Sequence, residues 1–293
     1  KQTHALDITR LWNYTWLEVP TDVKTFRVME GGFGKDDKHI FFVDRIVENV
    51  DYHTFRDMMD NRHYIDKDNV YTRSLEIVKD ANPVTYEVLK DGGVDYGNYI
   101  EYVWAKDDKH YFYRDSIIPV DYNSFKILTS DIMADKDFIY NLEDRKAFKK
   151  YPNKNGTSSG FTILSSIQVH TDRYFYYGKS LVSKDDFLEI EVKDPNSIKL
   201  YGWGSYFTID GEMYFHALKM ENADPTTFEV FNKDRGTDFA KDKNHFYLRS
   251  KIYPNVNPNE IKYDAKENEF SYRGKLWNWE TEKFDLEAKR NRR

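Results

Sequence analysis

The chain has 293 residues, of which 40% are hydrophobic, 32% charged and 17% aromatic, and it contains no cysteine. The bulky apolar content excludes a disordered chain, and the missing cysteine excludes disulfide scaffolds, thiolate metal sites and cysteine nucleophiles. No stretch approaches the roughly 18 apolar residues of a membrane span. The formal charge of −6 has the wrong sign for a nucleic-acid binder, which must neutralise phosphates.

The most frequent pattern along the chain is an Asp followed five positions later by Tyr or Phe. Seven good copies begin at Asp36, Asp66, Asp107, Asp135, Asp172, Asp210 and Asp242, and a degraded eighth begins at Glu267. From Asp36 to Asp242 the chain covers 206 residues in six steps, a mean period of about 34, which is typical of repeat architectures. We call this pattern the Asp–aromatic signature.

A second pattern alternates with the first. It consists of Asp or Asn, two residues, usually Ser or Thr, then in most copies an aromatic and an aliphatic residue. Copies begin at Asp22, Asp51, Asn82, Asp121, Asp194, Asp224 and Asn257. Four copies have proline directly after the first residue, the position where proline fits a helix start. The first residue is therefore predicted to cap a single helical turn. We call this pattern the capping signature.

Residues 100–128 show the local structure of one repeat most clearly. The aromatic and β-branched runs 100–105 and 110–114, joined by the polar turn 106–109, predict a β-hairpin. Residues 117–120 predict an edge strand, because Pro119 lacks the N–H that a central ladder needs. Each repeat is too small to bury its aromatic face alone, so neighbouring repeats must stack on it.

The segments DKDNVY at 66–71, DKNHFY at 242–247 and DPTTFEVF at 224–231 resemble the bacterial DKNYY repeat family. The resemblance covers roughly residues 20–275. It implies a β-rich bacterial repeat protein with no assigned catalytic residues.

We predict an all-β fold with short helical turns. Tandem repeats of about 34 residues, each a three-stranded antiparallel β-meander, would stack into a curved solenoid, and a closed propeller-like ring is the alternative. A single repeat domain would span 1–293. It would comprise an N-terminal cap or half repeat at 1–33, about seven repeats at 34–263 with an irregular insertion at 145–168, and a C-terminal half repeat with a basic tail at 264–293.

The candidate chemistry in the sequence is sparse. The Asp-rich turns lack the Gly and Glu of an EF-hand loop and are predicted to be solvated hairpin turns, so we expect no metal and no cofactor. His39, His110 and His245 share one repeat position, which favours a structural role. Ser158 lies in a G-T-S-S-G segment that matches the nucleophile elbow of hydrolases, but a loop composition surrounds it and a strand-like run follows. We expect the chain not to be an enzyme.

Three interruptions of the repeat, at 91–99, 145–160 and 201–206, are candidates for a working surface, although tolerated loop variation would also explain them. The candidate partner-binding residues in them are Asp95, Tyr96, Tyr99, Lys149, Lys150, Tyr151, Tyr201 and Trp203.

Three functions remain open at this point. The first is a non-enzymatic protein-binding scaffold, such as a bacterial inhibitor or immunity protein that blocks a basic toxin or effector. The second is a cell-envelope carbohydrate-binding or structural protein in which Trp203, Trp277 and Trp279 stack on sugars. The third is a hydrolase using Ser158. Absent cysteine is compatible with the bacterial periplasm or envelope, and a chain beginning at Lys1 is expected to be a mature or trimmed form.

Overall fold

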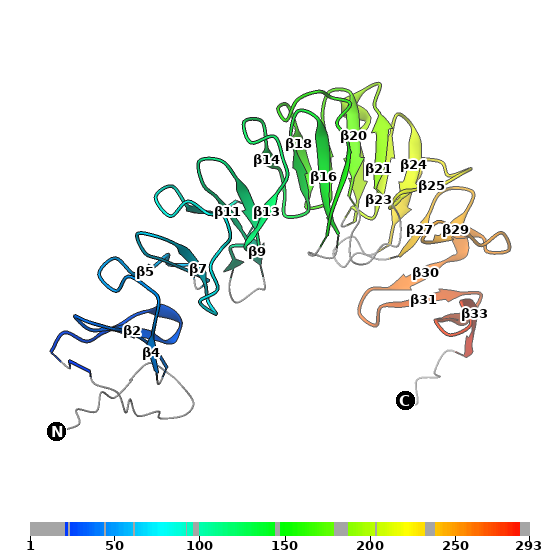
Figure 1. The fold of residues 1–293 in the computed structure, drawn as a ribbon. Coiled ribbons are helices and arrows are strands. Elements are labelled where there is room, and N and C mark those ends of the chain that lie inside the picture. Colours follow the sequence, from blue (N-terminus) through cyan, green and yellow to red (C-terminus); the bar gives the residue numbers. More distant parts are fainter. Residues whose placement is uncertain are drawn as a thin grey trace. The chain divides into compact units, whose positions relative to one another are not determined.

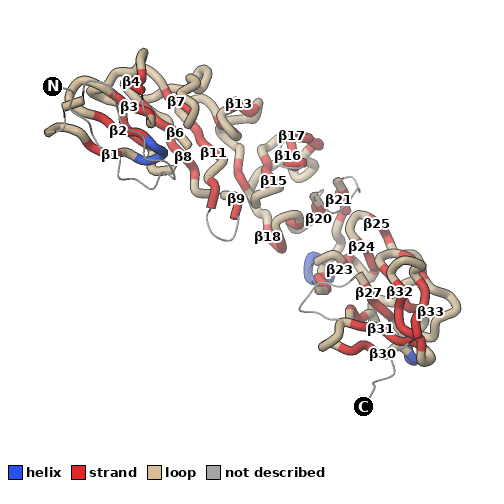
Figure 2. The backbone as a smooth tube through the Cα atoms, turned by 90° about the horizontal axis from the view of Figure 1, so that it is seen from below, coloured by secondary structure: helices blue, strands red, loops and turns tan. Residues whose placement is uncertain are grey.

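The computed structural model describes residues 21–22, 24–43, 45–60, 62–91, 93–95, 100–143, 147–178, 187–202, 204–231 and 238–287. Short strands alternate with loops, and helix is confined to brief 3-10 segments (Figures 1 and 2). The described strands form eight antiparallel sheets of three or four strands and one two-stranded hairpin, and none of these sheets closes into a barrel. The predicted all-β fold of repeated meanders is confirmed.

The chain divides into two compact units, and the first is Lys1–Ser130. Its first sheet contains β1 (Arg27–Val28), β2 (Phe33–Lys35), β3 (Ile40–Phe42) and β4 (Arg45–Val47), with the 3-10 segment η1 (Glu30–Gly32) between β1 and β2. The second sheet contains β5 (Arg56–Asp57), β6 (His63–Ile65) and β7 (Val70–Thr72), and a single bridge joins Tyr71 to Ile77. The third contains β8 (Glu87–Leu89), β11 (Trp104–Lys106), β12 (Tyr111–Tyr113) and β13 (Ser116–Ile118). The hairpin β9 (Val94–Asp95) and β10 (Ile100–Glu101) follows β8, and β14 (Lys126–Ile127) is the last strand of the unit.

The second unit is Asp131–Arg293. It begins with β15 (Ile132–Ala134), β16 (Phe138–Glu143) and β17 (Ala147–Pro152), and continues with a sheet of β18 (Thr162–Ser165), β19 (Gln168–His170), β20 (Tyr174–Tyr177) and β21 (Leu188–Glu191). The next sheet contains β22 (Lys199–Tyr201), β23 (Tyr206–Ile209), β24 (Glu212–Phe215) and β25 (Leu218–Lys219). The last two contain β26 (Glu229–Val230), β27 (Phe239–Lys241), β28 (Phe246–Leu248) and β29 (Lys251–Ile252), then β30 (Lys262–Asp264), β31 (Glu269–Tyr272), β32 (Lys275–Asn278) and β33 (Lys283–Glu287).

Strand pairing shows which capping signature and which Asp–aromatic signature belong to the same repeat. The capping signature supplies the first strand of a sheet and the following Asp–aromatic signature supplies its central hairpin, so most sheets have four strands where the sequence predicts three. The two segments predicted as half repeats each contribute strands to a complete sheet. β1, within residues 1–33, pairs with β2, and β31, within residues 264–293, pairs with β30.

Two further segments differ from their predictions. Residues 145–168, predicted as an irregular insertion, contain β17, which pairs with β16 over six residues, and also β18. The eighth Asp–aromatic turn is not at Glu267. Strands β31 and β32 meet at the turn Arg273–Gly274, so Tyr272 takes the Asp position and Trp277 the aromatic position. Both predictions relied on local composition. A strand's place in a sheet depends instead on the strand with which it pairs.

The Asp that opens the hairpin turn is a buried clamp in five repeats, at Asp36, Asp66, Asp107, Asp135 and Asp242, which corrects the prediction of solvated turns there. Asp172 is exposed and Asp210 is partly buried, and at the former turn the hydroxyl of Thr171 accepts the backbone N–H groups instead. Asp66 is 5% exposed. Its Oδ1 accepts the backbone N–H groups of Asp68 and Asn69, both at 2.8 Å. Its Oδ2 accepts the backbone N–H of Asp51 at 2.8 Å and the hydroxyl of Tyr71 at 2.7 Å. The three backbone bonds recur at Asp36, Asp107 and Asp242. One carboxylate thus joins the capping signature of a repeat to its Asp–aromatic signature.

Consecutive sheets within a unit pack face to face, because side chains alternate across each strand. On β23, Phe207 shares a core cluster with Phe175 of the preceding sheet, and its neighbour Tyr206 shares one with Tyr247 of the following sheet. In the first unit, Tyr64 packs with Phe33, and Ile65 with Phe112. The repeated Tyr and Phe residues therefore fill a seam between sheets, as the sequence predicts.

The predicted capped turns are present. Segments η2 (Pro195–Ser197) and η3 (Pro258–Glu260) are 3-10 turns with proline at their start. Asp194 and Asn257 cap them by accepting backbone N–H groups at 2.9 and 3.1 Å. In the described part of the chain, no helical segment has the length and apolar character needed to cross a membrane.

Candidate functional site

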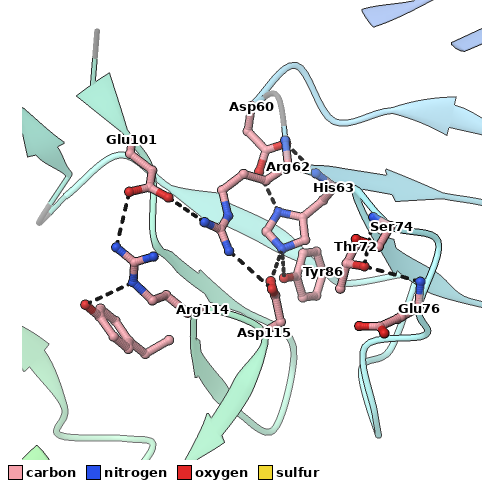
Figure 3. A network of polar contacts seen from close by, with 11 residues as sticks. Asp60, Arg62, His63, Thr72, Ser74, Glu76, Tyr86, Glu101, Arg114 and Asp115 are labelled. Atoms are coloured by element: carbon pink, nitrogen blue, oxygen red, sulfur yellow. Dashed lines mark hydrogen bonds and ion pairs between the residues drawn. The ribbon is translucent and has the colours of Figure 1, made fainter. Parts of the chain in front are cut away.

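A buried polar network interrupts the repeat pattern in the first unit (Figure 3). Its centre, His63, is the first residue of β6 and is 4% exposed. It stands three residues before the clamp Asp66, whereas the residues three positions before the other four buried clamps are buried and apolar: Phe33, Trp104, Ile132 and Phe239. A buried polar side chain at this position needs hydrogen-bond partners.

The imidazole of His63 lies between two carboxylates. Its Nδ1 is 2.5 Å from Oδ2 of Asp60, and its Nε2 is 2.7 Å from Oδ1 of Asp115. The hydroxyl of Tyr86 is 3.2 Å from the same Nε2. Asp60 precedes β6, whereas Asp115 lies between β12 and β13. The imidazole therefore joins the second sheet of the unit to the third.

Two arginines extend the contacts. The guanidinium of Arg62 donates to Glu101 at 2.6 Å and to Asp115 at 3.2 Å, and that of Arg114 donates to Glu101 at 3.2 Å. We call Asp60, Arg62, His63, Tyr86, Glu101, Arg114 and Asp115 the His63 network. With His63 protonated, the network carries three negative charges, on its carboxylates, and three positive charges, on its two arginines and His63.

The titration behaviour of the network agrees with that charge balance. Burial alone would lower the pKa of His63, but hydrogen bonds to Asp115 and Asp60 outweigh it and raise the pKa above its usual value. Burial alone would raise the pKa of Asp60 and of Asp115, but their bonds to His63 lower both. Burial raises the pKa of Tyr86. The two carboxylates thus favour the protonated form of His63.

This arrangement fits a structural link better than a reaction centre. Both ring nitrogens of His63 are engaged by carboxylates, so the imidazole is not poised as a free base. Across the described residues, no group of three or more His, Asp or Glu side chains is placed to hold a metal ion.

A second candidate is a pocket in the second unit, between the last strands of its final two sheets. Its volume is about 480 Å³, within the range of small-molecule sites. Aromatic rings from four residues line it: Tyr253, Tyr272, Trp277 and Phe284. The ion pair of Lys251 and Glu282, 2.9 Å apart, also lines it. We call this the aromatic pocket.

The family model for DKNYY matches residues 2–75, 22–144 and 206–290, which together cover most of the chain. The chain belongs to the DKNYY family. No curated protein and no solved structure matches it. The motif that names the family is, in this DKNYY chain, the hairpin turn whose Asp clamps two strands together.

Of the residues predicted from the sequence to bind a partner, the structure of this DKNYY chain describes Asp95, Lys149, Lys150, Tyr151 and Tyr201. Asp95 lies on β9, and Tyr96, Tyr99 and Trp203 fall outside the described residues. Tyr201 lies at the end of β22 and packs edge-to-face on Phe228, with ring centroids 5.5 Å apart. Their binding role stays a prediction.

The other three candidates lie together on β17. Lys149 and Lys150 are exposed. The ammonium of Lys150 is 4.5 Å from the ring centre of Phe138 on the paired strand β16. Tyr151 stacks on Phe187 with centroids 4.0 Å apart and planes 10° from parallel. These contacts position the side chains within their own unit, and they leave the two ammonium groups on the surface.

The hydrolase interpretation finds no support at Ser158. The residue is buried, with 5% exposure, in the loop between β17 and β18. A nucleophile elbow requires an exposed serine on a strand-to-helix turn, and here the next element is the strand β18. Of the tryptophans considered for sugar stacking, Trp277 lines the aromatic pocket and Trp279 is 60% exposed outside it.

The sequence analysis missed the His63 network and most of the aromatic pocket. An alignment of the repeats would have singled out His63, because it replaces an apolar residue that every other good copy carries. Its partner Asp115 is 52 residues away in the sequence, so only the packing of two sheets brings the pair together. The pocket likewise depends on how two successive sheets pack.

Proposed function

We propose that this DKNYY chain is a non-enzymatic scaffold that binds a partner protein along the edge formed by the last strands of its sheets. One recurring feature supports the proposal. In six repeats, the residue paired across the ladder with the aromatic residue of the Asp–aromatic signature is aliphatic: Ile46, Ile77 and Ile117 in the first unit, and Leu188, Leu218 and Ile252 in the second. We call these six the edge residues.

Three of the edge residues are exposed, whereas Ile46, Leu188 and Ile252 pack against core clusters. Ile77, Ile117 and Leu218 are 59%, 36% and 47% exposed, and the other three are partly buried. Single exposed aliphatic residues are common on protein surfaces, but scatter alone would not place an isoleucine at one register position in four sheets, as at Ile46, Ile77, Ile117 and Ile252. Leu188 and Leu218 are shifted by one residue, because the hairpin turns of their sheets begin at Thr171 and Ile209. Stacked sheets lie about 10 Å apart, so within each unit the edge residues recur at about that interval.

The strands that carry these residues also leave backbone groups available. β4, β13, β25 and β29 are the last strands of their sheets, so one side of each has no ladder partner in its own sheet. Open ladder groups beside regularly spaced apolar side chains are what a partner strand uses when it adds to a sheet edge. The geometry therefore favours recognition of a protein chain.

The charge of the chain favours a basic partner. A net charge of −6 attracts a basic protein and speeds its encounter. We propose that the partner is a bacterial toxin or effector, and that this chain acts as its inhibitor or immunity protein in the periplasm or cell envelope. The absence of cysteine is compatible with that oxidising compartment.

The test is affinity capture with the full chain from a lysate of the organism that encodes it, using the wild type and two matched variants. Ile117→Asp places a charge on the proposed edge. Val84→Asp makes the same charge change at a residue that is 85% exposed in the turn before β8. We expect the wild type and Val84→Asp to hold a stoichiometric basic protein. Ile117→Asp should weaken its binding about tenfold or more, because an unpaired charge is costly to bury.

Two results would overturn the proposal. Either no stoichiometric partner is recovered, or all three chains recover it equally. The inhibitor part has its own test: the recovered protein's toxic activity must fall in proportion to added chain. Unchanged activity at a one-to-one ratio would remove it and leave the binding scaffold.

A further inference from the structure

We propose that Asn155 is a modification site at which the folded chain deamidates spontaneously. The inference does not depend on the binding of a partner protein. Asn155 lies in the loop between β17 and β18 and is followed by Gly156, and these two residues are the only Asn–Gly pair in the sequence. Glycine has no Cβ, so it leaves its backbone nitrogen free to approach the preceding side chain.

The reaction needs only water as a co-reactant. The backbone nitrogen of Gly156 attacks Cγ of Asn155 and forms a new N–Cγ bond, while the bond from Cγ to Nδ2 breaks. The proton of the attacking nitrogen leaves with Nδ2, so ammonia is released and a succinimide ring closes. Water then adds to either carbonyl of the ring and opens it to aspartate or isoaspartate. In isoaspartate the main chain runs through Cβ and Cγ, so the backbone is longer by one methylene group.

The loop holds the two reacting groups close together and open to solvent. The Nδ2 atom of Asn155 lies 3.4 Å from the carbonyl oxygen of Thr157, so the side-chain amide is folded forward over the peptide nitrogen of Gly156. Gly156 is exposed, and apart from its chain neighbours no atom lies within 4 Å of the position that a Cβ would take. The ring can therefore form without displacing another part of the chain, and water can reach it.

Two hydrogen bonds of the turn oppose the reaction. The backbone N–H of Gly156 donates to the carbonyl oxygen of Asn153 at 3.0 Å, and that of Asn155 donates to Oδ1 of Asn153 at 3.1 Å. The attacking nitrogen must give up the first bond. The net free energy of one hydrogen bond predicts that the folded chain reacts about two- to tenfold more slowly than a free peptide.

Two other asparagines lack what Asn155 has. Asn257 precedes proline, whose nitrogen carries no proton to lose. Asn153 lies in the same loop but is 7% exposed, and its Nδ2 donates to the carbonyl oxygens of Asp135 at 2.6 Å and Thr157 at 2.9 Å. Its side chain is thus held away from the following peptide, and Asn153 is an internal control two residues from the proposed site.

Both products change the interruption of the repeat at 145–160. Each adds a negative charge directly after Lys154, whose ammonium pairs with Glu189 at 2.5 Å. Isoaspartate also lengthens the backbone between Asn153 and Thr157, whose bond closes the loop. The loop should therefore become less protected from hydrogen exchange once Asn155 is converted.

The experiment is incubation of the full chain at mildly alkaline pH, followed by peptide mapping with electron-transfer fragmentation, which distinguishes aspartate from isoaspartate. A synthetic peptide of residues 150–160 gives the rate without the fold. We expect Asn155 to convert within about tenfold of the peptide rate, while Asn153 stays intact. Asn155→Gln keeps a side-chain amide but requires a larger ring, so it should stay unmodified. Gly156→Ala places a Cβ beside the attacking nitrogen and should slow conversion of Asn155 about tenfold or more.

Three results would overturn the proposal: no conversion of Asn155 in the full chain while the peptide converts completely, equal conversion of Asn153 and Asn155, or conversion of Asn155 at the wild-type rate in Gly156→Ala. The last would show that the backbone nitrogen does not attack. Unchanged hydrogen exchange of residues 153–160 after conversion would remove the effect on the loop. Both variants change side chains in a partly exposed turn, so either one keeps the test decisive if the other fails to fold.

Discussion

Replacing Asp66 by alanine would remove the acceptor of four hydrogen bonds in the second repeat. Its carboxylate is buried and accepts from the backbone N–H groups of Asp51, Asp68 and Asn69 and from the hydroxyl of Tyr71, at 2.7–2.8 Å. Burial alone would raise the pKa of Asp66, but these bonds outweigh it and lower the pKa, so the group is ionised at neutral pH. Its loss should therefore separate the two signatures of the repeat.

The magnitude follows from what each donor loses. Hydrogen bonds to a charged group are worth about 1.5–3 kcal/mol each, and a buried donor left unpaired costs about 1–3 kcal/mol. The N–H groups of Asp68 and Asn69 lie near the surface and can be rehydrated, whereas the hydroxyl of Tyr71, on a residue only 3% exposed, keeps only a long contact of 3.4 Å to the carbonyl oxygen of Asn49. We therefore expect Asp66→Ala to destabilise its repeat by about 3–5 kcal/mol. Tyr71→Phe, which deletes one bond of the four, should cost about 1–2 kcal/mol.

Hydrogen exchange read by mass spectrometry on peptides covering residues 48–72 is the appropriate assay, because repeat proteins do not unfold in one step. A loss of 3 kcal/mol corresponds to more than about a hundredfold faster exchange. Asp68→Ala is the control in the same turn, since its carboxylate is exposed and contacts only Lys67 among the described residues. Equal exchange in Asp66→Ala and Asp68→Ala would refute the clamp.

Two other predictions concern the first unit. Because the folded-state pKa of His63 is raised, its contribution to stability is complete below the unfolded pKa of about 6.5 and is lost as pH rises through the folded pKa. The folded-state pKa values of Asp60 and Asp115 are lowered, so their contributions to stability are lost as pH falls through those values. An NMR titration of the His63 ring that gives a pKa at or below 6.5 would contradict this. Gly31→Ala should destabilise its repeat by about 3 kcal/mol, read by hydrogen exchange on peptides covering the substituted position, because its φ is +69° and a Cβ would lie 2.0 Å from the hydroxyl of Tyr64. Gly156→Ala, at the same φ with open space around it, should cost only about 1 kcal/mol, and equal losses would show that the contact with Tyr64 is unimportant.

Local chemistry was enough to predict several elements from the sequence. The hairpin of β11 and β12 and the edge strand β13 follow from aromatic runs, a polar turn and one proline. The caps at Asp194 and Asn257 follow from a capping residue before proline. In each of these elements the deciding interactions lie within a few residues of one another.

The phase of the repeat could not be predicted in this way. The carboxylate of Asp36 accepts from Asp22, fourteen residues earlier, whereas the sequence places the next capping residue, Asp51, at a similar distance ahead. Spacing alone does not say which neighbour is the partner. For the same reason, the sequence did not show that the eighth turn begins at Tyr272. The hydroxyl of Tyr272 accepts the backbone N–H of Asn257 at 3.3 Å, a bond that a carboxylate accepts in other repeats.

The candidate sites were less predictable than the fold, because each requires residues from two sheets. Asp115 reaches His63 only when the second and third sheets stack. Tyr253 reaches Trp277 only when the last two sheets of the second unit stack. Aromatic residues are so frequent in this chain that composition did not distinguish pocket walls from core.

The central claim is that the last strands of the sheets bind a partner protein. Hydrogen exchange of the full chain, with and without the protein recovered by capture, tests it most directly. We predict slower exchange on binding at residues 76–78 and β13 in the first unit, or at β25 and β29 in the second. Protection confined to the loop at 153–161, with exchange in these last strands unchanged, would contradict the claim.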